Sequence, residues 1–248
     1  MDYQIEICAG NIQSALNAEK GEADRIELCD NLWEGGTTPS LGAIELACDK
    51  LSIPVFVLIR PRGGDFVYAE NEFEVMKRDI EHAKIAGAKG IVSGVLTPDG
   101  NVDINRTKEL IHLTDPLPFT FHRAFDLTPD YGRALEEIID CGVKRILTSG
   151  QQMNVNAGLE TIKSLIDLAQ ERIQILPGGG VDEKNISRLY EIGCREFHFS
   201  AKSLTKGQTK VDSTIPMNGS KDIPEGEIYV SDPVKILRAK KILDNSTG

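Results

Sequence analysis

Two cysteines stand at matching positions in two similar segments of the sequence. Cys8 ends the run YQIEIC and Cys29 ends the run DRIELC, so the two segments share the motif IE[IL]C. If the runs form neighbouring parallel strands, which lie about 4.8 Å apart, their thiolates are close enough to hold one soft metal ion such as Cu(I) or Zn²⁺. The alternative is that both thiols only fill the protein interior as small hydrophobic groups.

Charged and imidazole side chains occupy alternating positions in several apolar runs. Strand side chains point to opposite faces in turn, so the residues between apolar ones that face a layer of helices must face the other side. This rule places five ionisable residues on one interior surface: Glu6, Glu27, Arg60, His122 and His198. A buried charge costs several kcal/mol unless a partner compensates, so we expect all five to converge in one hydrogen-bonded cluster. Such a cluster supplies the acids and bases of an active site, or it is a polar network that fixes strand register.

A third set of residues indicates an anion site. Residues 176–185, LPGGGVDEKN, place three glycines between an apolar run and a helix, where backbone N–H groups approach an anion closely. In eight-stranded α/β barrels, phosphate often binds at the loops after the seventh and eighth strands. The expected anion-binding residues are Arg62, Arg123, Gly178, Gly179, Gly180, Ser200 and Lys202. The alternatives are a tight glycine turn without a ligand and salt bridges at the rim.

The elements that must position these residues follow from a regular alternation of strand-like runs and helix-length segments, a pattern typical of βα units. The runs cover residues 3–8, 24–29, 54–60, 90–96, 118–125, 144–150, 173–179 and 196–202. Eight units in 248 residues favour an α/β fold, a closed (βα)8 TIM-like barrel, over an open doubly wound sheet, which is the alternative. In such a barrel all strand-to-helix loops open onto one face, where functional residues gather.

Residues 1–248 are expected to form a single barrel domain with one long loop between the eighth strand and the last helix. That loop spans about 203–230 and is polar, so it is either a floppy insertion or an ordered lid.

Composition excludes several classes of partner. The chain has 28 Lys and Arg against 38 Asp and Glu, a net charge of −10, and such a chain repels nucleic acids and anionic membrane surfaces. The N-terminal segment MDYQIEICAG has no basic stretch followed by an apolar one, which favours a cytoplasmic protein. In that reducing compartment the five cysteines are thiols.

Together these motifs closely resemble the CutC family, which is named for copper homeostasis. The resemblance covers the chain through residue 202 and rests on the IE[IL]C pair, EGGTTPS, VFVLIRPRGGDF, FTFHRAFD, RILTSG, LPGGG and EFHFSA. It implies a TIM-like barrel, a cytoplasmic location, a homodimer or larger homo-oligomer, and a role in handling copper. It also implies that Cys8 and Cys29 are the candidate Cu(I) ligands.

Two functions follow from these observations. The first is a copper homeostasis protein that binds Cu(I) through two thiolates at the barrel mouth. The second is an enzyme for a small phosphorylated or carboxylated substrate, with the glutamates and histidines as acid and base, Arg60 and Arg62 as clamps, and the glycine loop as phosphate site. The expected partner is accordingly a copper ion or a small anionic molecule, and no organic cofactor is implied.

Overall fold

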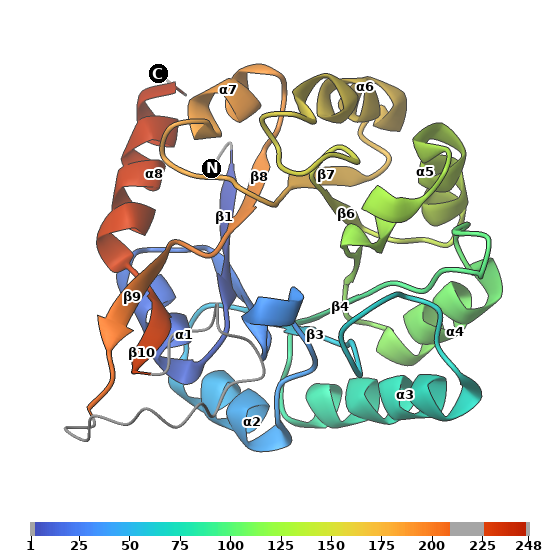
Figure 1. The fold of residues 1–248 in the computed structure, drawn as a ribbon, viewed down its shortest axis with the longest axis horizontal. Helices are drawn as coiled ribbons and strands as arrows, with labels where there is room; N and C mark the ends of the chain where they lie inside the picture. Colours follow the sequence, from blue (N-terminus) through green and yellow to red (C-terminus); the bar gives the residue numbers. More distant parts are fainter. Residues whose placement is uncertain (1–2, 209–225, 247–248) are drawn as a thin grey trace.

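The fold is an α/β barrel, seen along its axis in Figure 1. The computed structural model describes residues 3–208 and 226–246. Eight parallel strands surround the centre: β1 (Gln4–Ala9), β2 (Arg25–Leu28), β3 (Val55–Leu58), β4 (Gly90–Ser93), β5 (Phe119–Phe121), β6 (Arg145–Thr148), β7 (Gln174–Pro177) and β8 (Glu196–Phe199). The hydrogen-bonded order is β7-β6-β5-β4-β3-β2-β1-β8, so within the described residues the ladder is open only between β7 and β8. This nearly closed ring confirms the predicted barrel and excludes the open doubly wound sheet.

Helices form the outer layer of the barrel. They are α1 (Ile12–Lys20), α2 (Leu41–Lys50), α3 (Glu70–Ile85), α4 (Ile104–Thr114), α5 (Tyr131–Asp140), α6 (Leu159–Ala169), α7 (Ile186–Glu191) and α8 (Pro233–Ser246). Short polar side chains begin several of them: Asn11, for example, accepts a hydrogen bond from the N–H of Ser14 at 2.8 Å, which satisfies one of the unpaired donors of the first turn. Two short 3₁₀ helices, η1 (Leu32–Glu34) and η2 (Arg123–Leu127), lie in strand-to-helix loops.

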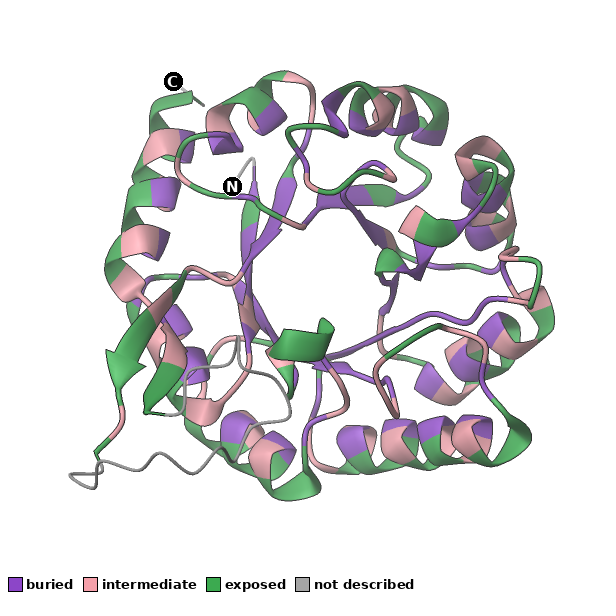
Figure 2. Cartoon of the chain, viewed as in Figure 1, coloured by how far each residue is buried: buried purple, intermediate pink, exposed green. Residues whose placement is uncertain are grey.

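The predicted alternation of strand side chains is confirmed. The apolar residues of β1 and β2 belong to the large core between strands and helices, and Figure 2 shows the buried sides of the helices turned toward the strands. The interior of the barrel holds a separate, smaller apolar group of Cys29, Phe56, Leu58 and Val92, with Cys8 and Leu32 packed against it. Other interior positions hold Glu6, Arg25 and Glu27 besides the apolar Leu147, so the barrel is not filled only by layers of branched aliphatic residues.

A buried ion network occupies the interior below this apolar group. Arg25 on β2 pairs with Glu6 on β1 and with Glu196 on β8, and Glu196 also accepts a bond from Arg145 on β6 at 2.7 Å. The two guanidinium groups lie over the ring of Phe56, at 5.2 Å and 5.4 Å from its centroid. These charges are compensated by close partners and by the aromatic face, as burial requires.

The long segment before α8 is ordered at both ends. Strands β9 (Lys202–Lys206) and β10 (Glu227–Ser231) pair antiparallel, with Lys202 opposite Ser231. The prediction of a loop over 203–230 is therefore wrong at both ends of this range, where hydrogen bonds between β9 and β10 form an antiparallel hairpin. The choice between a floppy insertion and an ordered lid concerns mainly residues 209–225, which lie outside the described residues.

In the two described ranges we find no helix that combines the length and the apolar character needed to cross a bilayer.

Replacing Arg25 by Ala should strongly destabilise the barrel. The change leaves the buried carboxylates of Glu6 and Glu196 without their shared partner, and losing one member of a buried ion network costs about 3–5 kcal/mol. Urea denaturation followed by circular dichroism measures the loss in free energy of unfolding. The matched control is Arg172→Ala, which breaks an exposed pair with Glu136 and should change stability little. Similar losses in both variants would contradict a structural role for the interior network.

Candidate functional site

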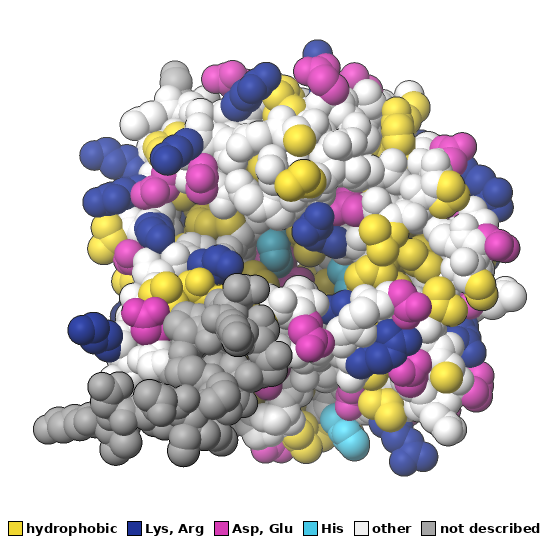
Figure 3. Space-filling view, viewed as in Figure 1, with side chains coloured by type: hydrophobic (Ala, Val, Ile, Leu, Met, Phe, Trp, Pro, Cys, Tyr) yellow, Lys and Arg dark blue, Asp and Glu magenta, His cyan; other side chains and the backbone are white. Residues whose placement is uncertain are grey.

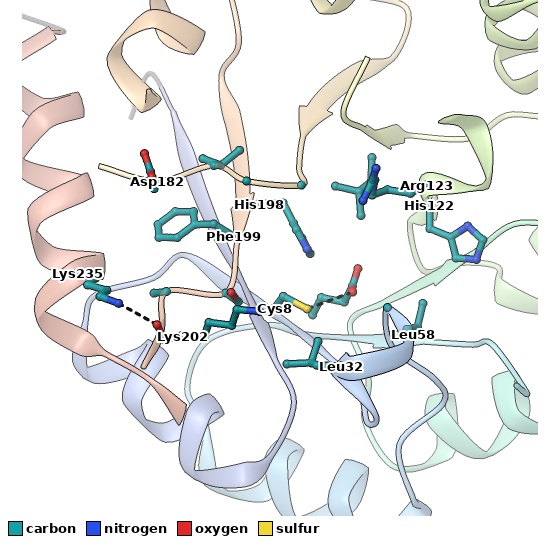
Figure 4. Close-up of a pocket in the computed structure, with 18 of the residues that line it drawn as sticks. Cys8, Leu32, Leu58, His122, Arg123, Asp182, His198, Phe199, Lys202 and Lys235 are labelled. Atoms are coloured by element: carbon teal, nitrogen blue, oxygen red, sulfur yellow. Dashed lines mark hydrogen bonds between the residues drawn. The ribbon is translucent and has the colours of Figure 1, made fainter. Parts of the chain in front are cut away.

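A cavity of about 720 Å³ opens at the barrel mouth, where the carboxyl ends of the strands and the loops after them meet. Figure 3 shows this hollow with Lys and Arg side chains around it, and Figure 4 shows the residues that line it. Four of the five predicted ionisable residues are among the lining residues: Glu27, Arg60, His122 and His198. Glu6 is fully buried beneath them. The volume is in the range of pockets that hold small molecules, roughly 300–1,000 Å³.

The two motif cysteines meet on one side of the cavity. Cys8 lies near the end of β1 and Cys29 directly follows β2, and their Sγ atoms are 3.6 Å apart. Cys8 is half-buried and lines the cavity, whereas Cys29 is buried. The contact with Cys29, followed by burial, raises the pKa of the Cys8 thiol well above its usual value. Cys8 is therefore a neutral thiol, and we call the two free cysteines Cys8 and Cys29 the dithiol.

A carboxylate completes a set of three donor groups around this dithiol. Glu27 Oε1 lies 3.8 Å from Cys8 Sγ, and donor atoms of Cys8, Glu27 and Cys29 all lie within 4.8 Å of one another. A linear arrangement with metal–sulfur bonds of about 2.3 Å, the zinc–thiolate length, would separate the two sulfurs by about 4.6 Å. The observed 3.6 Å fits a bent arrangement in which a third donor shares the ion.

His198 and Glu6 form a second ionisable group next to the thiols. His198 Nδ1 lies 2.7 Å from Glu6 Oε1, and Figure 4 shows the ring directed into the cavity. Burial alone would raise the pKa of Glu6, but Arg25 and His198 outweigh it and hold this pKa at about 2. Burial would likewise lower the pKa of His198, but the Glu27 carboxylate, Cys8 and Glu6 raise it well above its usual value. Glu6 thus fixes the orientation of an imidazolium ring.

Glu27 links the two groups, because it belongs both to the set with the cysteines and to a set with Glu6 and His198. Burial raises the pKa of Glu27 to about 7, against the opposing effect of His198. Its Oε2 atom is buried and has no hydrogen-bond partner among the described residues. A buried acceptor without a partner costs about 1–3 kcal/mol, so this atom marks a place where a bound group is expected.

Arg60 and His122 lie elsewhere in the cavity wall, so the predicted single cluster is wrong. Arg60 donates to the carbonyl oxygens of Glu34, Gly36 and Gly64 at 2.7–2.9 Å, and its guanidinium lies 5.0 Å from the ring centroid of Phe66. Backbone carbonyls of two loops, and not the glutamates, satisfy this charge. Arg60 therefore organises the loops at the mouth with its two Nη atoms, whereas its Nε atom has no partner among the described residues.

His122 belongs with Arg60. Its ring packs on Phe66 with centroids 4.8 Å apart, and its Nδ1 accepts a hydrogen bond from the N–H of Ala124 at 3.2 Å. Burial, with a smaller contribution from Arg60, lowers the pKa of His122 to about 3. Its Nε2 atom is buried and has no partner within the described ranges. His122 is thus a neutral imidazole with one unused nitrogen.

The glycine loop is only partly as predicted. The N–H of Gly178 donates to Thr148 O at 2.8 Å and so continues the strand ladder, which removes it from the expected anion ligands. Gly179 and Gly180 have φ values of +95° and +86°, and no acceptor for their N–H groups is found among the described residues. Both line the cavity.

The other predicted anion ligands divide into two groups. Arg123, Ser200 and Lys202 line the cavity. Arg62 does not, because its guanidinium pairs with Glu72 at 2.6 Å and Asp65 at 3.0 Å. Arg62 therefore serves neither as an anion ligand nor as the second clamp of the enzyme hypothesis.

The sequence reasoning missed the partners that make the interior charges tolerable. Arg25 lies two positions before Glu27, and Glu196 two positions before His198, so the same alternation rule places both inside the barrel. It also missed the cavity-lining Lys184 and Lys235. Lys235 comes from the first turn of α8, at the helix end that follows the hairpin of β9 and β10.

Comparisons with known proteins agree with the barrel and with the motifs. The model of the CutC family matches residues 3–203. A copper homeostasis protein cutC homolog of Homo sapiens is 45% identical over 245 residues, 98% of this chain and 90% of that protein. A solved CutC structure from Streptococcus agalactiae has a TM-score of 0.76 at 35% identity and covers 80% of this chain and 98% of that one. The phosphoribosylanthranilate isomerase of Thermotoga maritima, at 12% identity, a TM-score of 0.58 and 98% coverage of each chain, supports the fold alone.

His122 should make the protein less stable in acid. The unfolded chain takes up a proton on this residue below about pH 6.5, whereas the folded protein does so only near pH 3, so the free energy of unfolding falls as pH decreases through this window. His122→Asn retains a side-chain acceptor for the N–H of Ala124 but does not titrate. The difference in free energy of unfolding between the wild type and this variant should fall by about 1.4 kcal/mol for each pH unit of acidification below pH 6. Above pH 7 this difference should stay constant. Denaturant titrations from pH 8 to pH 4 measure it, and parallel pH profiles of the two proteins would contradict a buried neutral imidazole.

Proposed function

This chain belongs to the CutC family, and from that premise we propose that it acts in copper homeostasis by holding Cu(I) between the sulfurs of Cys8 and Cys29. The observation that carries the proposal is the 3.6 Å separation of the two Sγ atoms at the wall of an open cavity. Thiolates are the protein ligands that select Cu(I), and two adjacent ones are sufficient to bind it in preference to hard divalent ions.

The surroundings of the dithiol support a site that is loaded from the cavity. Cys8 lines the cavity and is reached first, whereas Cys29 is buried and accessible only through its neighbour. Glu27 lies on the same side as a third donor, and its unpartnered Oε2 atom is available to the ion or to a proton displaced from sulfur. The carboxylate is a hard ligand, so in this proposal the sulfurs determine the metal and Glu27 only completes the coordination.

The remaining cysteines are not part of this proposal. Cys141 and Cys194 are buried in the hydrophobic core, and Cys48 packs against that core from α2. We further propose that the protein works in the cytoplasm, where a reducing environment keeps all five cysteines as the free thiols that the structure describes. A homodimer or larger homo-oligomer stays a prediction, which the molar mass in solution measures.

The wild-type protein should bind about one equivalent of Cu(I) per chain, and Cys8→Ser/Cys29→Ser should weaken this binding by about 100-fold or more, because a hydroxyl is a hard ligand that cannot replace a thiolate. Competition with a chromophoric Cu(I) chelator under anaerobic, reducing conditions measures the affinity. Circular dichroism spectra of both proteins establish that the variant is folded.

Cys48→Ser is the matched control, since it removes a half-buried thiol outside the cavity and should leave Cu(I) affinity unchanged. Equal affinities in the wild type, the double variant and the control would mean adventitious binding, and the proposed copper site would then be wrong.

A further inference from the structure

The cavity is far larger than one metal ion requires. Its volume is about 720 Å³, whereas a water molecule, which is comparable in size to a coordinated ion, occupies roughly 30 Å³. The dithiol and Glu27 lie at β1 and β2, whereas η2 and the loop after β7 form a second wall of the cavity. The segment that follows β8 lies between these two walls, because β8 pairs with β1. This second wall has its own chemistry, which the copper proposal does not use.

Positive side chains line the cavity, although the chain as a whole has a net charge of −10. Arg123 and Lys184 belong to the second wall, whereas Figure 4 shows Lys202 and Lys235 on the other side of the cavity from Arg123. Arg123 Nε donates to Asp126 at 2.7 Å and its Nη2 to Ser149 at 2.8 Å, so two bonds fix the guanidinium while Nη1 stays available. A guanidinium held in this way is preorganised to bind an oxyanion.

Two acids also line this wall. Asp182 accepts a hydrogen bond from the N–H of Lys184 at 2.8 Å, which closes a local turn. Glu183 lies 3.6 Å from Arg238 of α8, and its Oε1 atom is buried without a hydrogen-bond partner among the described residues. An anion on this wall must therefore bind close to Arg123 and away from these carboxylates.

Backbone donors lie beside Arg123. A Cβ atom on Gly179 would lie 3.2 Å from Arg123 Cζ, so the missing side chain lets the guanidinium pack against this loop. The N–H groups of Gly179 and Gly180 have no acceptor in the described part of the chain. The unpaired N–H of Gly179, next to a fixed guanidinium, is a donor that an oxyanion requires, and Gly180 follows it in the same loop.

Buried polar atoms without partners provide the independent observation. His122 Nε2, Arg60 Nε and Glu27 Oε2 are all buried and unpaired within the described residues, and all three side chains line this cavity. Each unpaired atom costs about 1–3 kcal/mol unless a bound molecule supplies the missing hydrogen bond. His122 follows β5, Arg60 follows β3 and Glu27 lies on β2. A ligand that reaches these atoms from the glycine loop must have polar groups besides its anionic end.

We propose that the barrel mouth binds a small polar metabolite carrying a phosphate group, with the phosphate against Arg123 and the N–H groups of Gly179 and Gly180. The polar body of the ligand then extends toward His122 and Arg60, whose Nε2 and Nε atoms are unpaired within the described residues. Phosphate is favoured over carboxylate because its additional oxygen and charge match the backbone N–H groups, the guanidinium and Lys184 of the same wall. The proposal goes beyond copper binding and does not depend on it.

The test is isothermal titration calorimetry with inorganic phosphate, and with acetate at equal ionic strength. Wild-type protein should bind phosphate saturably and at least about tenfold more tightly than acetate, and Arg123→Gln should weaken phosphate binding by about tenfold or more. Arg133→Gln, which removes an exposed arginine of α5 paired with Glu137, is the matched control and should bind as the wild type does. Tighter binding of acetate would assign the site to carboxylates instead.

Two further variants keep the result interpretable. Arg123 also holds Asp126 and Ser149, so Lys184→Gln provides a change at a side chain with no hydrogen bond among the described residues, and it should weaken phosphate binding about threefold. Cys8→Ser/Cys29→Ser should bind phosphate as the wild type does, which separates failure of this proposal from failure of the copper site. Absence of saturable phosphate binding, or equal affinity in the wild type, Arg123→Gln and Arg133→Gln, would overturn the proposal.

Discussion

The structure of the site depends on the burial of one carboxylate, that of Glu6. A fully buried charge is tolerated only with close partners, and Glu6 has two: the guanidinium of Arg25 and the imidazole of His198. The two bonds connect β1 with β2 on one side and with β8 on the other. They therefore fix strand register and, at the same time, hold the His198 ring beside the thiol of Cys8. The polar network that stabilises the barrel is also what positions the candidate site.

The interior charges separate into two groups because two kinds of partner satisfy them. Glu6 and His198 are satisfied by other side chains, whereas Arg60 is satisfied by the carbonyl oxygens of two loops and by the face of Phe66. The guanidinium of Arg60 also disfavours protonation of His122, which stays neutral. The thiols of the cavity thus lie beside the group of Glu6, Glu27 and His198, whereas the neutral imidazole of His122 lies beside Arg60.

The sequence predicted those parts of the site that depend on strand periodicity. Successive side chains of a strand point to opposite faces, so the alternation of apolar and polar residues placed Glu27, His198 and the two cysteines inside the barrel. It could not predict that Arg60 binds Gly36 O and Gly64 O, because the path of these loops is determined by turn geometry and tertiary packing. It also could not distinguish Gly178, whose N–H belongs to the ladder, from Gly179, whose N–H does not, because the point where a ladder ends depends on the neighbouring strand. The alternation rule is sufficient to place Arg25 inside the barrel. It does not predict the ion pair of Arg25 with Glu196, which lies 171 residues away in the sequence.

Charge couples the two proposed sites through their common cavity. Two thiolates carry two negative charges and Cu(I) carries one positive charge, so the loaded pair of Cys8 and Cys29 has a net charge of −1, next to the carboxylates of Glu27 and Glu6. In a cavity with an effective dielectric constant well below that of water, this charge disfavours an anion bound in the same cavity beside Arg123. Because coupling free energies are reciprocal, an anion that binds less tightly in the presence of the metal must weaken metal binding by the same factor. The two proposed ligands therefore occupy different parts of one cavity but oppose each other through charge.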